Sequence, residues 1–363
     1  MNDLVKPTII TMGEPGGIGV EIALKAFLSR HEVGLKPSIL LSCPNHASQI
    51  QALFFPSLSL EFISPQTPHE KITEIWEHSL PVMPLSNQVS TNLGFAEAKN
   101  AAAVIESITT GFHLVEQEYA SSLVTAPIQK SSLQEAGFQF PGHTEFLESL
   151  SQKAGFKDAF SIMLLASDTL NVVPLTIHIP LKDVVQNISK ERIISLTSRL
   201  YEELKLKFGI NNPHIAMTGL NPHAGEDGRM GLEEKNIIIP AIKQLQSEGV
   251  NVTGPYPADT MFHKAAREQY DCALAMYHDQ ALIPIKTLDF DEGVNITLGL
   301  PIIRTSPDHG TALDIAEKAI ARPQSMINAI KYAQKLGSGR DYLVRSAPID
   351  LHCERTRKRW NYL

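Results

Sequence analysis

Short apolar runs alternate with longer amphipathic segments along almost the whole chain of 363 residues. Runs of roughly four to eight apolar residues are typical of buried strands, whereas an apolar residue at about every third or fourth position indicates a helix packed on one side. Because each helix returns the chain to begin the next strand, this alternation predicts an α/β fold with a largely parallel or mixed sheet. The expected strands are 7–12, 37–43, 121–127, 172–178, 213–220 and 271–277, and the expected helices are 18–28, 95–118, 143–155 and 189–209.

The composition excludes several classes of protein. Hydrophobic residues make up 43% and charged residues 20%, as in a globular chain that forms one large or two medium domains. A net charge of −7 argues against nucleic acid as a partner. The first residues, MNDLVKPTII, lack an apolar core of signal-peptide length, and no apolar run approaches the roughly 18 residues of a membrane helix, so no membrane partner is expected.

The three cysteines, Cys43, Cys272 and Cys353, form no Cys-x-x-Cys pair. Their odd number and wide spacing predict free thiols rather than a disulfide framework, which fits a cytoplasmic location. Cys272 lies in the apolar run CALAMY, where a buried core position is the simplest interpretation.

Two stretches depart from the alternating pattern. Residues 63–94 are rich in Pro, Ser and Asn and predict a surface excursion within a domain. The tail after Gly337 ends in CERTRKRWNYL, whose basic run we interpret as a solvated terminus. The helix expected at 95–118 contains Gly111, and an interruption of this helix would be expected near that glycine.

The segment TIITMGEPGGIGVEIALKAF, residues 8–27, places four glycines between an expected strand and an expected helix. It is not a dinucleotide fingerprint, because Ile22 stands where a third glycine is needed after Gly17 and Gly19. It is not a Walker loop either, because Val20 and Glu21 follow the last glycine. The glycines either let backbone N–H groups approach an anion or serve only the local backbone, and both interpretations stay open.

Four expected strands, at 121–127, 172–178, 213–220 and 271–277, run directly into polar residues. Ligands of open α/β sheets bind at the carboxyl ends of strands, so we expect these ends to share one cleft. Three of them lead to histidines, namely His178, His223 and His278. Neutral imidazoles on rigid strand ends suit a divalent transition metal, although for each histidine taken alone a hydrogen-bonded, partly buried side chain is the simpler interpretation.

His143 and Thr144 follow a Pro-Gly turn and open an expected helix, with Glu145 in its first turn. The pair either presents donors to an anion at the positive end of the helix, or Thr144 only caps that helix.

Lys286, Asn295 and Arg304 recur at intervals of nine within otherwise apolar segments. A buried cation needs a charged partner, which is either a phosphate or carboxylate of a substrate or an internal salt bridge. Asp259, in GPYPADTMF, is either a helix cap or a carboxylate of the site.

Seven segments between about Pro7 and Leu336 together resemble the 4-hydroxythreonine-4-phosphate dehydrogenase family of pyridoxal 5'-phosphate biosynthesis. In chain order they are GEPGGIGVEI, TAPIQK, FPGHTEFL, GLNPHAGEDGRMG, GPYPADTMF, MYHDQALIPIK and GVNITLGLPIIRTSPDHGTALDIA. The resemblance implies a two-domain α/β/α fold similar to isocitrate and isopropylmalate dehydrogenases, with the active site in an interdomain cleft at a homodimer interface. By the same analogy, 1–136 and 288–363 form a cofactor-side domain and 137–287 a metal-site and dimerisation domain.

The resemblance also implies roles for single residues, with the active sites shared between subunits and the part of the chain from His278 onward contributed by the partner. Candidates for the general base are Lys286, Asp259 and Asp279, or a metal-bound water. The metal ligands fall on His178, His223 and His278, the substrate-binding residues on His143, Thr144, Lys286, Asn295 and Arg304, and the cofactor loop on Gly16, Gly17 and Gly19. The chain departs from the family pattern at Gly16 and Val20, which leaves the details of the cofactor loop open.

The implied reaction uses NAD or NADP and one divalent cation (Zn, Mg, Mn or Co) per active site. It oxidises the C3 hydroxyl of 4-phosphooxy-L-threonine to a β-keto acid, which decarboxylates to 3-amino-2-oxopropyl phosphate. A related dehydrogenase of D-threonate or D-erythronate 4-phosphate is the alternative within the same chemistry. A metal-dependent phosphohydrolase and a phosphate acyltransferase are alternatives from other classes.

Overall fold

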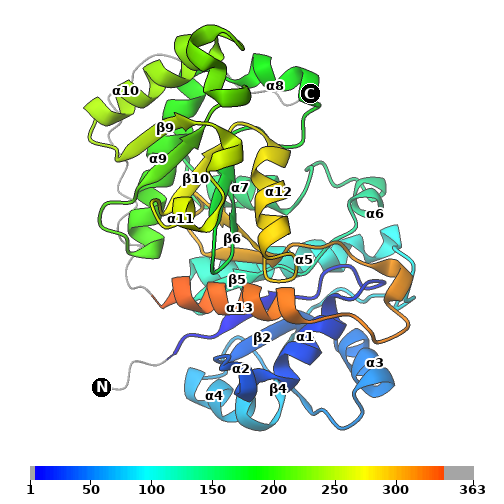
Figure 1. The fold of residues 1–363 in the computed structure, drawn as a ribbon. Coiled ribbons are helices and arrows are strands. Elements are labelled where there is room, and N and C mark those ends of the chain that lie inside the picture. The colour runs from blue at the N-terminus through cyan, green and yellow to red at the C-terminus, as the bar shows by residue number, and fades with distance from the viewer. Residues whose placement is uncertain (1–4, 339–363) are drawn as a thin grey trace.

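The computed structural model describes residues 5–338, which form one twelve-stranded sheet with helices on both faces (Figure 1). The strand order is β3-β4-β2-β1-β5-β12-β11-β6-β7-β10-β8-β9. The strands are β1 (Thr8–Thr11), β2 (Ser38–Ser42), β3 (Leu60–Phe62), β4 (Leu80–Pro84), β5 (Ser122–Val124), β6 (Ile162–Ala166), β7 (Asn171–Pro174), β8 (Ile215–Thr218), β9 (Val252–Tyr256), β10 (Cys272–Ala275), β11 (Val294–Leu298) and β12 (Arg304–Pro307).

Most strands are joined through helices, as the alternating sequence predicted. The helices are α1 (Gly19–Leu28), α2 (Arg30–Val33), α3 (Pro44–Phe54), α4 (His69–His78), α5 (Ala101–Glu116), α6 (Lys130–Glu135), α7 (His143–Lys153), α8 (Leu181–Asn187), α9 (Lys190–Phe208), α10 (Ile239–Ser247), α11 (Lys264–Arg267), α12 (His278–Leu288) and α13 (Gln324–Gly337). Short helical turns are η1 (Ala98–Asn100), η2 (Pro222–Gly228), η4 (Ala258–Thr260) and η5 (Leu313–Ile315), and η3 (Glu234–Ile238) is a π-helical turn.

The sheet reverses direction in its middle. From β3 to β12 every pair of neighbouring strands is parallel, and so is every pair from β7 to β9. The pairs β12–β11, β11–β6 and β6–β7 are antiparallel. The strands β7, β10 and β8 therefore run opposite to β5, and their carboxyl ends lie at the edge of the sheet where β11 ends and β12 begins. This mixed sheet confirms the predicted α/β class.

The two ends of the sheet belong to two halves of the molecule. In Figure 1 the first strands and α13 form the lower half, and the segments from β7 to α12 form the upper half. Because one continuous sheet runs through both halves, the sheet itself sets no boundary at 136 or 287, and the predicted division into domains stays a prediction.

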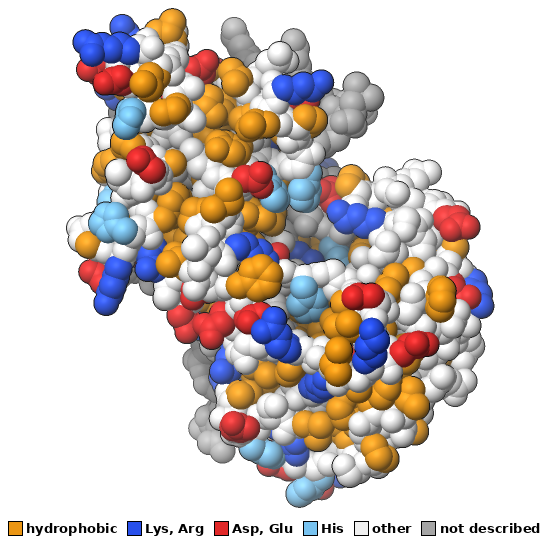
Figure 2. All heavy atoms as spheres, turned by 45° about the vertical axis from the view of Figure 1, so that its right-hand side comes forward, with side chains coloured by type: hydrophobic (Ala, Val, Ile, Leu, Met, Phe, Trp, Pro, Cys, Tyr) orange, Lys and Arg blue, Asp and Glu red, His pale blue; other side chains and the backbone are white. Residues whose placement is uncertain are grey.

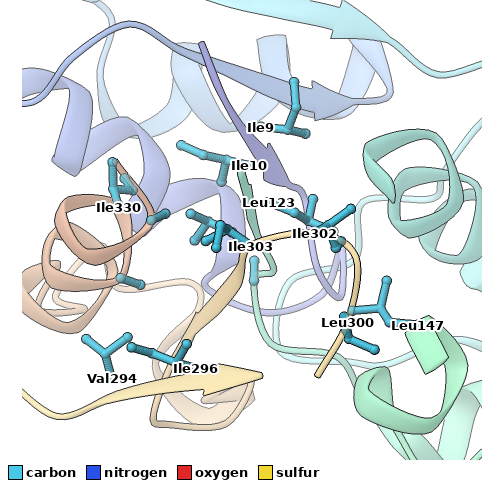
Figure 3. Close-up of a cluster of buried hydrophobic side chains, with 14 of the residues drawn as sticks. Ile9, Ile10, Leu123, Leu147, Val294, Ile296, Leu300, Ile302, Ile303 and Ile330 are labelled. Carbon is cyan, nitrogen blue, oxygen red and sulfur yellow. The ribbon is translucent and has the colours of Figure 1, made fainter. Parts of the chain in front are cut away.

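The β11–β12 hairpin is packed into the hydrophobic core of the molecule (Figure 3). Ile302 and Ile303, just before β12, are each 1% exposed and lie beside Leu123 of β5. The Thr305 hydroxyl donates a hydrogen bond to the Ala329 carbonyl of α13 at 2.8 Å. Successive residues of a strand face opposite sides of the sheet, so the residue before Thr305 faces away from α13. The core thereby fixes the direction in which this hairpin presents its polar side chains.

The prediction that residues 63–94 form a surface excursion is wrong. This stretch contains α4, which buries Ile72, Ile75 and Trp76 at helical spacing, and the strand β4, which lies between β3 and β2. The Trp76 ring contacts the Phe27 ring of α1 edge-on at 5.0 Å. The apolar residues of both elements are few and are flanked by prolines, so the composition of the stretch concealed them.

Two smaller expectations can also be compared with the structure. Helix α5 continues through Gly111, where an added Cβ would stand 2.6 Å from the Leu123 side chain and would require that side chain to shift. Cys272 is buried, which confirms its predicted place in the core, and both Cys272 and Cys43 are free thiols. Cys353 and the basic tail lie outside the described residues.

One buried histidine makes the stability of this fold depend on pH. His46 of α3 is 1% exposed, and burial lowers its pKa from 6.5 to about 4. Between these values the unfolded chain takes up a proton that the folded chain refuses, so we expect the free energy of unfolding to fall by about 3 kcal/mol as the pH falls from 6.5 to 4. Denaturant titrations at several pH values should show a smaller loss for His46→Gln, while His31→Gln, at an exposed histidine, keeps the wild-type slope. Equal slopes for His46→Gln and the wild type would contradict this assignment.

Candidate active site

Two histidines meet at the carboxyl ends of β7 and β10, which are parallel neighbours. The rings of His178, after β7, and His278, which opens α12, lie 5.7 Å apart between centroids. His278 Nδ1 is 2.8 Å from an Asp279 carboxylate oxygen. A proton held on Nδ1 by this carboxylate leaves Nε2 free as a ligand. Burial, reinforced by Lys130 and His278, lowers the pKa of His178, so its imidazole is neutral near pH 7.

His223 lies in the turn η2 after β8, which pairs with β10. It begins a run of six residues with positive φ, from His223 to Gly228, and His178 also has a positive φ of 53°. Such backbone is unfavourable for a residue with a side chain and is typical of functional sites. Within residues 5–338 no group of three His, Cys, Asp or Glu side chains is placed to hold a metal ion. One chain therefore brings His178 and His278 together and leaves His223 apart from them.

One buried and one partly buried side chain hold the strand ends that carry these histidines. Glu234, 2% exposed, accepts hydrogen bonds from the backbone N–H groups of Leu220 at 2.8 Å and Asn221 at 2.7 Å. Gln280 accepts one from the backbone N–H of Met276 at 2.7 Å and donates one to the Gly219 carbonyl at 2.8 Å. The segments leading to His223 and His278 are thereby tied to each other.

A second set of polar residues surrounds Arg304 at the start of β12. This side chain is 3% exposed, and its guanidinium donates to the hydroxyls of Thr125, at 3.0 and 2.7 Å, and Thr297, at 2.8 Å. No carboxylate lies within 4 Å of it in the part of the chain that the structure describes. Burial lowers its pKa to about 10, opposed by Glu145, so Arg304 remains a cation at neutral pH.

Asn295 and His143 complete the surroundings of this cation. Asn295 pairs with Ser306 across the β11–β12 hairpin, and Thr297 pairs with Arg304. Opposite residues of an antiparallel pair share a face, as do alternate residues of one strand, so Asn295 lies on the face of Arg304. His143 Nε2 is buried without a hydrogen-bond partner, and burial, together with Arg304 and Lys130, lowers the pKa of this histidine well below its usual value.

The remaining predicted residues have more ordinary surroundings. Thr144 does not cap α7, because the cap position is Gly142 and no side chain caps it. Lys286 forms an ion pair with the Asp308 carboxylate and donates to the Asp308 carbonyl at 3.1 Å, so an internal salt bridge accounts for it in this structure. Asp259 is exposed on η4, which contacts η2, the turn of His223.

Sequence reasoning did not select four residues that belong to this site. Two of them, Thr125 and Thr297, bind Arg304, and their signal was only the polar end of an apolar run. The other two, Lys130 and Glu145, act electrostatically on His178. Lys130 lies in the TAPIQK segment and Glu145 in the FPGHTEFL segment. Sequence alone could not select them, because it does not show which charged side chains lack an ion-pair partner. Lys130 acts on His178 from the first position of α6, after β5, and not from a common strand edge, because β5 runs opposite to β7.

The surface is hollowed between the two halves of the molecule, and histidine, lysine and arginine side chains gather along the hollow (Figure 2). A small cavity of about 180 Å³ lies beside the two neighbouring histidines. Its lining residues are Thr176, His178, Ile179, Leu181, Val184, Tyr277, His278 and Asp279.

The glycine-rich segment is packed against backbone of its own chain. A Cβ on Gly16 or Gly19 would overlap the carbonyl oxygen of Phe95 or Met12, and one on Gly17 would stand 2.7 Å from the Thr311 carbonyl oxygen. Internal packing therefore accounts for these glycines, and their assignment to a cofactor loop stays a prediction.

Residues 37–333 match the family described as "Pyridoxal phosphate biosynthetic protein PdxA". The chain belongs to this family. It is 49% identical to the 4-hydroxythreonine-4-phosphate dehydrogenase of Ruegeria sp. (strain TM1040), covering 92% of this chain and 98% of that protein. It is 45% identical to the enzyme of that name from Methylorubrum populi, covering 91% and 94% respectively.

A crystal structure of the 4-hydroxythreonine-4-phosphate dehydrogenase of Klebsiella pneumoniae is 36% identical, with a TM-score of 0.80 over 92% of this chain and 99% of that chain. These relatives are named as dehydrogenases, which are oxidoreductases, and the chain is likewise an oxidoreductase. No helix in the described part is long and apolar enough to cross a membrane.

The packing of the glycine segment predicts a stability effect that does not depend on any cofactor. Gly19→Ala should lower the free energy of unfolding by about 1–3 kcal/mol, because its Cβ would overlap the Met12 carbonyl oxygen. Gly310→Ala is the matched control, since an added Cβ there meets nothing within 4 Å. Thermal denaturation without ligands measures both, and an unchanged melting temperature for Gly19→Ala would show that the segment is not constrained in this way.

Proposed function

We propose that the chain oxidises the C3 hydroxyl of 4-phosphooxy-L-threonine with NAD and a divalent cation, and that the β-keto acid formed loses carbon dioxide to give 3-amino-2-oxopropyl phosphate. The observation that carries this proposal is the buried Arg304 guanidinium, which has no carboxylate partner in the described residues. A phosphate fits a planar guanidinium through two parallel hydrogen bonds. The relatives that share the name of this activity support the same reaction.

The donors of the site suit a divalent transition metal in their chemistry. His178 is neutral, and Asp279 orients His278 so that one ring nitrogen faces away from it. His178 and His278, with His223 as a third ligand, would hold the cation. When bound, such a cation lowers the pKa of an alcohol and polarises a carbonyl oxygen. Because His223 stands apart within one chain, we propose that the active sites are completed in a homodimer, in which a second copy contributes to the ligand set.

The chain's own residues bind and orient the substrate. Arg304 and Asn295 hold the phosphate on the face of β11 and β12 that turns away from α13. His143, which is half-buried and neutral, has a buried ring nitrogen without a partner, and this nitrogen accepts or donates one hydrogen bond to the same ligand. Fixing the anion in this way orients the carbon skeleton toward the histidines and supplies much of the rate enhancement through positioning.

The hydroxyl proton needs an acceptor. Among the three candidates Asp279 is engaged by His278 and Lys286 by Asp308, whereas no hydrogen bond engages the Asp259 carboxylate within residues 5–338. This contrast favours Asp259 as the general base in the proposed reaction.

The proposal predicts how the enzyme responds to loss of Arg304. Purified protein supplied with a divalent cation should form NADH from 4-phosphooxy-L-threonine, and a chelator should abolish the activity. Arg304→Met should lower kcat/KM by about a hundredfold or more, because the substrate loses a charge-assisted bidentate contact. Arg322→Met is the matched control, since Arg322 is an exposed arginine paired with Asp291 at the surface.

Three outcomes would count against the proposal. Wild-type activity in Arg304→Met would remove the anion-binding role of this residue. Release of inorganic phosphate without NADH would indicate the phosphohydrolase instead. Turnover of D-threonate or D-erythronate 4-phosphate alone would keep the chemistry and change the substrate.

A further inference from the structure

Helix α9 carries three charged side chains at four-residue spacing on one side, which we call the α9 trio: Arg199, Glu203 and Lys207. Glu203 and Lys207 are 5% and 7% exposed and form an ion pair of 2.7 Å. Arg199 Nε lies 3.5 Å from the other carboxylate oxygen of Glu203. Removing two charges from water costs about as much as their attraction returns, so a buried ion pair adds little to stability by itself. Stability alone therefore does not account for the α9 trio.

The α9 trio binds the backbone of Gly299, the first residue after β11. Glu203 accepts a hydrogen bond from the Gly299 N–H at 2.8 Å, and Arg199 Nη2 donates one to the Gly299 carbonyl at 3.3 Å. Gly299 has a φ of 79°, and a Cβ at this residue would overlap the Phe160 carbonyl oxygen. The backbone of Gly299 is thus held at both of its polar groups in a conformation that favours glycine.

Lys207 binds the rest of the turn between β11 and β12. Its Nζ donates to the carbonyls of Leu300 at 2.9 Å and of Ile302 at 3.5 Å. The side chains of these two residues are buried in the core (Figure 3), where backbone polar groups need partners within the protein. An apolar side chain at position 207 could pack in the same place, but it would leave both carbonyls without this donor.

The turn leads directly into Arg304. Ile302 stands two residues before Arg304, and Thr297, two residues before Gly299, accepts a hydrogen bond from the Arg304 guanidinium at 2.8 Å. The turn therefore joins the two strand positions between which the guanidinium is held. A change in the backbone of the turn would shift Arg304 relative to Thr297, and with it the group that the substrate phosphate would meet.

Helix α9 also reaches the part of the molecule that carries the histidines. It lies in the upper half of the molecule (Figure 1) and contacts η3. Glu234 of η3 accepts hydrogen bonds from the backbone N–H groups of Leu220 and Asn221, in the segment that leads to His223. One helix is thus in contact both with the turn before Arg304 and with the element that holds the segment before His223.

We propose that Arg199, Glu203 and Lys207 are positioning residues, which act through the β11–β12 turn to fix the Arg304 guanidinium for the substrate phosphate. This inference rests on the proposed function, in which Arg304 binds the phosphate. Misplacement of a binding group by about 1 Å can lower the rate of a reaction by about a hundredfold. Side chains that hold the turn therefore affect catalysis without touching the substrate.

A purely structural role for the α9 trio makes a different prediction. Loss of Lys207 would then lower the free energy of unfolding, and any loss of activity would be the same whether or not Arg304 is present. If Lys207 acts through Arg304, its loss has no further effect once the guanidinium has been removed. Combining the two substitutions therefore separates the two roles.

The test is a double-mutant cycle of Lys207→Met and Arg304→Met, with NADH formation from 4-phosphooxy-L-threonine as the readout. Methionine keeps most of the length of the lysine side chain and removes its donors. Lys205→Met is the matched control, because Lys205 is partly exposed on the same helix and pairs with Glu202 at 3.2 Å. Thermal denaturation of each variant sets an assay temperature at which all of them are folded.

Lys207→Met should lower kcat/KM about tenfold, mainly through a higher KM, because the phosphate contact is the same in the bound substrate and in the transition state. In the Arg304→Met background the same substitution should change kcat/KM by less than about twofold. Lys205→Met should keep the wild-type values. An equal loss in both backgrounds, or a wild-type KM for Lys207→Met, would overturn the inference.

A second variant decides the question if Lys207→Met does not fold. Arg199 is only partly buried, and Arg199→Met removes its hydrogen bond to the Gly299 carbonyl while the ion pair of Glu203 and Lys207 stays in place. This variant should raise KM about threefold when Arg304 is present and leave it unchanged in the Arg304→Met background. The same change in both backgrounds would show that the α9 trio does not act through Arg304.

The other members of the cycle separate failure of this inference from failure of the proposed function. A wild type that forms no NADH, or an Arg304→Met variant with wild-type activity, would overturn the proposed function and the inference with it. An active wild type and an impaired Arg304→Met variant, together with wild-type kinetics for Lys207→Met and Arg199→Met, would overturn the inference alone.

Discussion

A guanidinium buried without a carboxylate is unfavourable unless something else compensates its charge, and the middle of this sheet is built around one. Arg304 stands at the start of β12, held by two threonine hydroxyls, one just after β5 and one in β11. Hydroxyls satisfy some of its donors but leave its charge unmatched. The surrounding core keeps the group in place, because Ile302 and Ile303, just before Arg304, are packed beside Leu123. The anion that this charge requires is the central element of the proposed activity.

The antiparallel strands in the middle of the sheet explain how this cation comes to face the histidines. Because β11 is antiparallel to β12 and to β6, the beginning of β12 lies at the edge toward which β7 and β10 run. The residues after those two strands, His178 and His278, therefore open toward the same side of the sheet as Arg304. A fully parallel sheet would have placed the beginning of β12 at the opposite edge from these carboxyl ends. The reversal of direction is thus a requirement of the site as well as a feature of the fold.

Much of this arrangement could be predicted from local sequence. Apolar runs that end in a polar residue indicated the strands that lead to His178 and His278, and an arginine inside an apolar segment indicated that Arg304 needs an anion. Properties that depend on tertiary neighbours could not be predicted in this way. The spacing of residues does not reveal that Lys286 is paired with Asp308 while Glu145 is left unpaired. Nor does a run of glycines reveal that carbonyl oxygens of Phe95 and Met12 occupy the space where side chains would stand. The strand β4 and helix α4 were missed because a few apolar residues between prolines carry too weak a pattern.

The most direct test is a crystal structure of the protein with a divalent cation and 4-phosphooxy-L-threonine. The account predicts the phosphate within hydrogen-bond distance of the Arg304 guanidinium, and the cation on ring nitrogens of His178 and His278. A phosphate bound instead at the glycine-rich segment, with Arg304 still contacting only Thr125 and Thr297, would contradict it. In that case the buried charge would be a structural feature of the sheet, and the anion site would have to be sought elsewhere in the chain.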